Sequence, residues 1–249
     1  EEDARGTVVI EHAGVGDLAE TVEIEAKDRS ELTVVSVQEA ERSARHVSHQ
    51  RIRVGRDAKV RHIVVTLGGD AVRIATSSEF AGEGGDVELL GAYITEGGEH
   101  HEHRLFVDHN PPNCISRATY KGALQGEDAH SVWIGDVLIR PTATNTDTYE
   151  LNRNLVLTRG GKADSVPNLE IETGEIAGAG HASATGRFDE EQLFYLRARG
   201  VPEDVARRLV VRGFFAELVE SIGVESVQAK LMAAIERELD LAQASRDAE

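Results

Sequence analysis

Short segments of alternating apolar and polar residues, separated by glycine turns, fill the chain from about Thr7 to Ile176. A period of two gives a β-strand one face toward a core and one toward solvent. β-Branched residues dominate these segments, and no amphipathic helix of useful length lies between them. The pattern predicts strands at residues 7–10, 21–25, 32–37, 51–54, 60–67, 71–75, 87–94, 103–107, 115–120, 132–139, 154–157 and 169–172.

A faint internal repeat accompanies these strands. A turn of the form Gly-x-x-Ala precedes a β segment at Gly16, Gly55, Gly126 and Gly160. This recurrence suits a solenoid, in which each coil buries its inward aliphatic residues only against neighbouring coils. Glycine turns also occur in antiparallel sandwiches and barrels, so the pattern alone leaves those folds open.

From Asp189 onward the apolar residues follow helical spacing. They predict three helices, over residues 189–199, 202–222 and 224–248. In the second helix Val210, Val211 and Phe214 widen the apolar stripe beyond one face. That stripe either binds a partner protein or packs against the β region.

Composition and charge restrict the function classes. A chain of 249 residues with 40% apolar residues can support a substantial core. Its formal net charge of −17 argues against nucleic acid and anionic membranes as partners, because both require clustered Lys and Arg. No apolar run is long enough to span a membrane. The chain begins at Glu1 without a secretory leader, so we expect a cytoplasmic protein whose N-terminal region is missing here.

Cys114 is the only cysteine, which excludes an intrachain disulfide and fits a reducing compartment. A free thiol could accept sulphur, but we favour a small buried residue at the start of a strand.

Histidines and carboxylates gather in residues 99–103 and again at Asp108 and His109. On a strand, His101 and His103 share a face, and with His109 they could bind Zn²⁺ or Fe²⁺. The spacing fits no closed structural zinc site. We therefore favour a solvated polar turn over a metal site.

The stretch 164–200 joins the β and helical regions and contains one isolated histidine. His181 is the only strong ligand among the small residues 178–186, where glycines let the backbone approach another group closely. The residues alone leave a structural and a functional role open for this imidazole.

The sequence PNLEIETGEIAGAGHASATGRFDEEQLFYLRARGV, from Pro167 to Val201, resembles the C-terminal signature of the SufB/SufD family. That family supplies scaffold proteins to the SUF machinery of iron–sulphur cluster assembly. Weaker similarity extends from about Leu89 to about Ile222. The resemblance implies a right-handed parallel β-helix over residues 1–186 and a small helical domain over residues 187–249.

The resemblance also implies a non-enzymatic scaffold subunit. It places His181 at the interface with a SufB-type partner, where a transient iron–sulphur cluster would bind. It places a docking site for the SufC ATPase on the helices, and the apolar residues expected there are Leu193, Phe194, Leu196, Leu209, Phe214 and Leu218.

The chain departs from the family pattern near His181. Some members carry Cys two positions before that histidine, and others carry Glu immediately before it; here these are Ala179 and Gly180. Residues 145–157, where SufB-type chains place a thiolate, contain no Cys. These departures favour SufD over SufB, and they mean that the remaining cluster ligands come from a partner.

Two alternatives stay open. A β-helix polysaccharide lyase or esterase could use Asp and His residues of the region 87–120. A homodimeric SufB/SufD paralogue could pair with itself when isolated. The sequence contains no Gly-x-Ser-x-Gly elbow and no Walker A loop.

Overall fold

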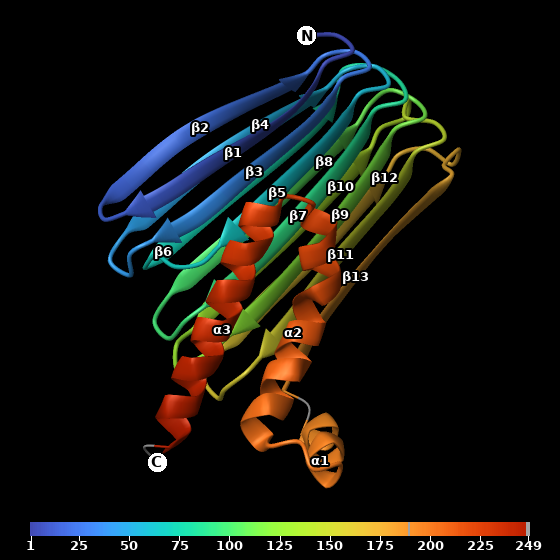
Figure 1. Ribbon diagram of the computed structural model, residues 1–249. Coiled ribbons are helices and arrows are strands. Elements are labelled where there is room, and N and C mark those ends of the chain that lie inside the picture. The colour runs from blue at the N-terminus through green and yellow to red at the C-terminus, as the bar shows by residue number, and fades with distance from the viewer. Residues whose placement is uncertain (189, 248–249) are drawn as a thin grey trace.

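Two parallel β-sheets face each other, and the chain passes alternately from one to the other (Figure 1). A computed structural model describes residues 1–188 and 190–247, and within them it contains thirteen strands and three helices. The seven-stranded sheet contains β1 (Arg5–Gly14), β3 (Glu31–Ala40), β5 (Lys59–Thr66), β7 (Asp86–Thr95), β9 (Ile115–Leu124), β11 (Asp147–Val156) and β13 (Gly178–Arg187). The six-stranded sheet contains β2 (Asp17–Ala26), β4 (Arg45–Val54), β6 (Ala71–Phe80), β8 (His100–His109), β10 (His130–Ile139) and β12 (Lys162–Ile171).

Every strand pairs in parallel with the strand two places along the chain. One coil therefore holds two strands and two turns. The coil lengthens along the solenoid: Arg5 aligns with Glu31, 26 residues on, whereas Ile115 aligns with Asp147, 32 residues on. This topology confirms the parallel β-helix, because the sandwich alternative requires antiparallel sheets.

The four inner strands of the six-stranded sheet, β4, β6, β8 and β10, strictly alternate between buried residues and residues that are exposed or partly exposed. In β4, His46, Ser48, Gln50, Ile52 and Val54 point into the solenoid and are buried, while the residues between them are exposed. One face of this sheet therefore covers the interior and the other meets solvent, as the period of two predicts.

Four strands of the seven-stranded sheet, β5, β7, β9 and β11, lose this alternation toward their C-terminal ends. In β7 every residue from Leu89 to Thr95 is buried. The outward residues of this sheet, among them Val35, Ile63 and Leu90, form one core with residues of the helices. A near-continuous apolar strand is the pattern expected when both faces of a sheet are covered.

Three helices follow the last strand: α1 (Glu190–Ala198), α2 (Glu203–Ile222) and α3 (Glu225–Asp247). Figure 1 shows α2 and α3 lying across the seven-stranded sheet. Phe215 of α2 is fully buried in the shared core. The Lys121 ammonium on β9 donates to the Phe214 carbonyl at 3.0 Å, and Lys230 on α3 pairs with Glu39 on β3 at 3.1 Å. The helices therefore share a core with the sheet.

The strand at residues 178–187 was not predicted, because its sequence has small residues in place of alternating apolar ones. It is a strand because it continues the ladder of β11. The first predicted helix begins at Asp189, outside the described residues. No helix in the described part of the chain combines the length and apolar character needed to cross a membrane.

Two glycines make room for tyrosines inside the solenoid. Gly122 on β9 lies opposite Tyr93 on β7, and Gly91 lies opposite Tyr120. A methyl group on Gly122 would lie 1.9 Å from the Tyr93 ring, and one on Gly91 would lie 2.0 Å from the Tyr120 ring. The two buried rings therefore depend on glycine at the neighbouring position.

Candidate functional site

Among the described residues, no strand pairs with the outer side of β13 or β12 at the C-terminal end of the solenoid. These two strands are therefore the edges of their sheets. β13 has the sequence GAGHASATGR and carries no charged side chain before Arg187. Natural proteins protect free edges with Lys, Pro, bulges or covering segments. β13 has no Lys and no Pro, so its edge is chemically open to another strand.

The backbone amides of β13 alternate between β11 and the free edge. Gly178 and Phe188 donate to the carbonyls of Thr146 and Val156 at 3.1 and 3.0 Å. Within β13, the amides of even-numbered residues therefore point toward β11. The amides of odd-numbered residues, such as Ser183, point in the plane of the sheet toward the free edge.

His181 lies on β13 in register with Glu150 on β11, and its side chain is exposed. In-register residues of a parallel sheet share a face, so His181 and Glu150 both lie on the inner face. The bond from Asn154 to the Thr185 hydroxyl, at 3.4 Å, agrees with this orientation. The imidazole is thus presented at the open end of the interior.

Glu150 is a buried carboxyl group directly behind His181 in the ladder. It is 2% exposed, and neither of its carboxylate oxygens has a hydrogen-bond partner among the described residues. Burial, and next the charge of Asp136, raises the pKa of Glu150 to about 7. This carboxyl can therefore gain or lose a proton near neutral pH, one strand away from the exposed imidazole.

A hydrogen-bonded network continues inward from the same end. Asn152 donates to the Tyr93 hydroxyl at 3.0 Å and accepts from Ser165 at 2.8 Å, and Asn154 donates to Asn152 at 2.8 Å. These bonds satisfy the amide groups inside the solenoid and hold the inner faces of β11 and β12 in register.

His101, His103 and His109 lie on strand β8 and not in a solvated turn, so that expectation was wrong for these three histidines. His101, His103 and His109 point inward and are at most 1% exposed. His101 contacts the Thr95 hydroxyl at 3.1 Å, and His103 contacts the Thr66 hydroxyl at 3.0 Å and stacks on Tyr93. The structure confirms that His101 and His103 share a face.

The rings of β8 do not gather as a metal site with a third ligand. Among the described residues, the one group of three ligand side chains whose donor atoms lie within 4.8 Å of one another is His12, Glu20 and His46. Sequence reasoning missed this group. Its available signal was the coil period, since Glu20 aligns with Ser48, 28 residues on and two residues from His46 on the same face of β4.

Cys114 is fully buried in the turn before β9. Its thiol contacts the carbonyls of Gly82 and Pro112 at 3.6 and 3.5 Å. Burial raises the pKa of the thiol to about 11, so the group is a neutral thiol at physiological pH. This environment matches the small buried residue that the sequence analysis favoured.

The residues expected at the ATPase docking face fall into two groups. Leu193 and Leu218 are each 2% exposed and belong to the core shared by helices and sheet, so they cannot face a partner. Leu196 and Phe214 pack partly against the same core. These four residues stabilise the chain itself, which corrects the expectation that the whole set faces outward.

The other two docking residues are exposed. Phe194 on α1 is 75% exposed and Leu209 on α2 is 49% exposed. Tyr195 and Val205 add further exposed apolar surface on the same two helices. The apolar surface available to a partner is therefore Phe194, Tyr195, Val205 and Leu209.

The fold and its open end define a class of protein: a parallel β-solenoid with helices on one sheet and an unpaired edge strand carrying one histidine. A family model described as "SUF system FeS cluster assembly, SufBD core domain" matches residues 1–214. This chain belongs to the SufBD family of the SUF system of iron–sulphur cluster assembly.

Curated relatives agree with this assignment. The chain is 56% identical over 251 residues to an iron–sulphur cluster assembly SufBD family protein of Mycobacterium tuberculosis, covering 98% of this chain and 63% of the relative. It is 57% identical to a SufBD family protein of Mycobacterium leprae, covering 94% of this chain and 61% of the relative. It is 28% identical to the SufD protein of Escherichia coli, covering 78% of this chain and 45% of that protein. The chain thus spans less than two thirds of the length of these relatives and is SufD-like.

Proposed function

We propose that the chain is a non-enzymatic scaffold subunit of the SUF machinery in the cytoplasm. It pairs through the free edge of β13 with a SufB-type subunit, and a transient iron–sulphur cluster forms where the two subunits meet. The observation that carries this proposal is an unprotected edge strand with an exposed histidine on its inner face.

Backbone pairing supports the choice of this edge. Small residues on β13 let a second strand approach closely, and unpaired amides on the outer side supply hydrogen bonds. Gly178 and Gly180 leave no side chains beside Asp147 and Tyr149 of β11, respectively. A partner strand added here would extend the seven-stranded sheet.

The ligand chemistry supports a shared cluster. An imidazole can bind iron beside sulphur donors, as in Rieske centres. Cys114 is the chain's only thiol, and it is buried and protonated. The sulphur ligands of a cluster at His181 would therefore come from the partner subunit.

Replacing His181 by Ala tests this role directly. We expect His181→Ala to fold normally, because the ring is exposed, and to lower cluster maturation in cells by more than about tenfold. Maturation is measured as the activity of an iron–sulphur enzyme that depends on the SUF system. The matched control is His49→Ala, which removes an exposed histidine from the outer face of β4. Full maturation with His181→Ala would contradict the role of His181 as a cluster ligand.

The exposed apolar residues of α1 and α2 support an ATPase docking face. Large apolar side chains that remain exposed in a folded chain commonly mark protein interfaces. We propose that a SufC-type ATPase docks on Phe194 and Leu209. ATP hydrolysis takes place on that partner, since the sequence here lacks a phosphate-binding loop.

The double variant Phe194→Asp, Leu209→Asp is expected to weaken ATPase binding by more than about tenfold. Binding is measured by calorimetry with the purified ATPase, and unfolding in urea verifies that the fold is intact. Val15→Asp is the control, because Val15 is 72% exposed at a turn far along the chain from the helices. Unchanged affinity in the double variant would place the docking face elsewhere.

The same edge could also pair two copies of this chain. Strand addition depends mainly on the backbone, so β13 of a second copy is a chemically suitable partner in the absence of a SufB-type subunit. The lyase or esterase alternative has less support, because His101, His103 and His109 of β8 lie inside the solenoid. A polymeric substrate on the surface cannot contact them.

A further inference from the structure

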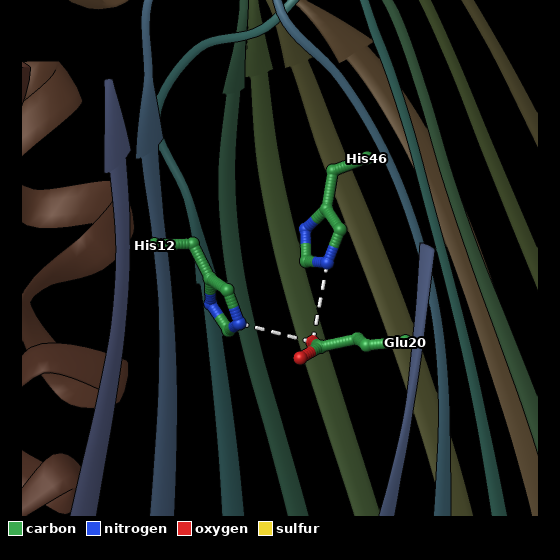
Figure 2. Close-up of side chains that lie close together, drawn as sticks. All are labelled: His12, Glu20 and His46. Atoms are coloured by element: carbon green, nitrogen blue, oxygen red, sulfur yellow. Dashed lines mark hydrogen bonds and ion pairs between the residues drawn. The ribbon is translucent and has the colours of Figure 1, made fainter. Parts of the chain in front are cut away.

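Three ligand side chains meet inside the first coils of the solenoid, at the end opposite β13 (Figure 2). They come from three different strands: His12 from β1, Glu20 from β2 and His46 from β4. All three point inward, between the two sheets. His46 is buried, and the side chains of His12 and Glu20 are 12% and 20% exposed.

One oxygen of the carboxylate lies between the two rings. The Glu20 Oε1 atom is 3.0 Å from His12 Nε2 and 3.1 Å from His46 Nε2. Two ligands bound to one metal ion at about 2.1 Å are about 3.0 Å apart at a right angle and about 3.4 Å apart in a tetrahedron. The two distances from the carboxylate oxygen to the imidazole nitrogens therefore match those around a bound metal, and all three donor atoms lie within 4.8 Å of one another.

The amide of Gln38 controls the protons of both imidazoles. Its Nε2 donates to His12 Nδ1 at 2.8 Å, and its Oε1 accepts from His46 Nδ1. One amide has one donating end and one accepting end. One of the two neutral rings therefore carries its proton on Nδ1, whichever way the amide is turned.

That ring presents an unprotonated Nε2 to the carboxylate. With the amide as assigned, it is the ring of His46, and its lone pair faces a Glu20 oxygen 3.1 Å away. Two acceptors at hydrogen-bond distance repel each other unless a cation lies between them.

We propose that His12, Glu20 and His46 bind one divalent transition-metal ion of the Zn²⁺ and Fe²⁺ class. Two imidazoles and one carboxylate form a donor set typical of these ions and unlike the all-oxygen sets of Ca²⁺ and Mg²⁺. His46 and Glu20 offer their donor atoms as they stand. His12 becomes a ligand when its proton moves from Nε2 to Nδ1 and the Gln38 amide turns to Ser36, which it already contacts at 3.2 Å.

The surroundings of the group match those of known metal sites. Histidine ligands in proteins usually donate their second ring nitrogen to an oxygen acceptor, as His46 does to Gln38. The carboxylate also accepts from Ser48 at 2.9 Å, which fixes its orientation. This site is independent of the proposed role of His181.

The test is a titration of the metal-free chain with Co²⁺, followed by its visible ligand-field absorption. We expect a single high-affinity Co²⁺ per chain, displaced by Zn²⁺. Glu20→Gln and His46→Gln are each expected to raise the Kd by more than about 100-fold, beyond the roughly 10–100-fold effect of outer partners. His49→Gln, on the outer face of the same strand as His46, and His181→Ala, at the other end, are expected to leave the Kd unchanged.

X-ray absorption on the Co²⁺-loaded wild-type chain gives a second readout that does not depend on how a variant folds. We expect scattering from two imidazoles. Fewer than two imidazoles, no Co²⁺ uptake by the wild-type chain, or unchanged affinity in Glu20→Gln would each overturn the site. Loss of binding in His181→Ala or His49→Gln with retention in His46→Gln would also overturn it, because the ion would then bind elsewhere.

Discussion

Lowering the pH from 7 to 4 is expected to reduce the free energy of unfolding by about 5–8 kcal/mol, at about 1.4 kcal/mol for each unit of pKa shift. Four imidazoles inside the solenoid are responsible. Burial lowers the pKa of His62, His101 and His109 to about 4 and that of His103 to about 3.

The sign of this pH effect follows from comparing the protonation of each ring in the unfolded and the folded chain. In the unfolded chain a histidine takes up a proton below about pH 6.5, whereas the buried ring stays neutral until pH 4 or 3. The stabilising contribution is therefore complete above pH 6.5 and is lost as the pH falls to the folded pKa. A loss of this size approaches the total stability of a typical domain.

Two buried carboxyls act in the opposite direction. Burial raises the pKa of Glu99 and Glu150 to about 7, while unfolded Glu titrates near 4.5. The folded state binds these protons first, so their contribution increases as the pH falls from 7 to 4.5. Two carboxyls offset only part of the effect of four imidazoles, and the expected range includes this offset.

Urea unfolding at pH 7, 6, 5 and 4 and constant ionic strength measures the effect. His103→Gln should show a weaker pH dependence than the wild-type chain, since it removes the ring with the largest shift. His49→Gln, which removes an exposed ring, should follow the wild-type curve. A urea midpoint that stays constant from pH 7 to pH 4 would contradict the neutral burial of these histidines.

Replacing Ser183 by Pro is expected to weaken pairing with a SufB-type subunit by more than about 100-fold, or about 3 kcal/mol. The amide of Ser183 faces the free edge of β13. Proline removes that donor and places its ring where the partner strand would lie. The ladder to β11 keeps its bonds, because edge strands tolerate proline on the solvent side.

The neighbouring position provides the matched control. The amide of Ala182 faces β11, so Ala182→Pro should destabilise the fold while leaving the outer amides in place. Pairing is measured by calorimetry with the purified partner, and stability by urea unfolding. If Ser183→Pro pairs normally, the interface does not use this edge. If both variants destabilise the fold equally, the assignment of the amides is incorrect.

The repeating pattern of the sequence predicted most strands but left the solenoid and the antiparallel folds open, and the parallel β-helix was implied only by the resemblance to the SufB/SufD family. Most predicted strands lie within the observed ones because their β-branched residues alternate. β13 has no such pattern, since its conformation comes from the ladder of β11 rather than from its own side chains. The inner face of β13 lies at the open end of the solenoid and is not covered by a core. Its sequence therefore does not need an apolar residue at every second position.

The histidines of β8 show why polarity alone gave the wrong environment. Charged and polar residues at 99–103 suggested solvent, yet alternation had already placed His101 and His103 on one face. That face is the interior, where Thr66, Thr95 and Ser116 supply hydrogen-bond partners from other strands. Thr95 and Ser116 are near their histidines in sequence, whereas Thr66 is 37 residues from His103 and cannot be identified from the neighbouring sequence.

For the helices the error was the reverse, because residues expected on an exposed docking face are buried. Leu193 and Leu218 belong to wide apolar stripes, and helical spacing does not reveal which side of such a stripe meets the sheet. The group of His12, Glu20 and His46 was missed for a related reason. Its members come from three strands and meet only because successive coils stack in register.

The position of α2 and α3 also determines how the molecule would respond to a pulling force. A bare solenoid held at its C-terminal end would unravel one coil at a time, since each coil contacts only its neighbours. Here the helices are anchored to β3 through Lys230 and to β9 through Lys121, with a shared core that extends to β11. Traction on the helices is distributed over several coils at once and loads them in shear. A motor protein attached to these helices would therefore tilt the coils together instead of peeling off the last one.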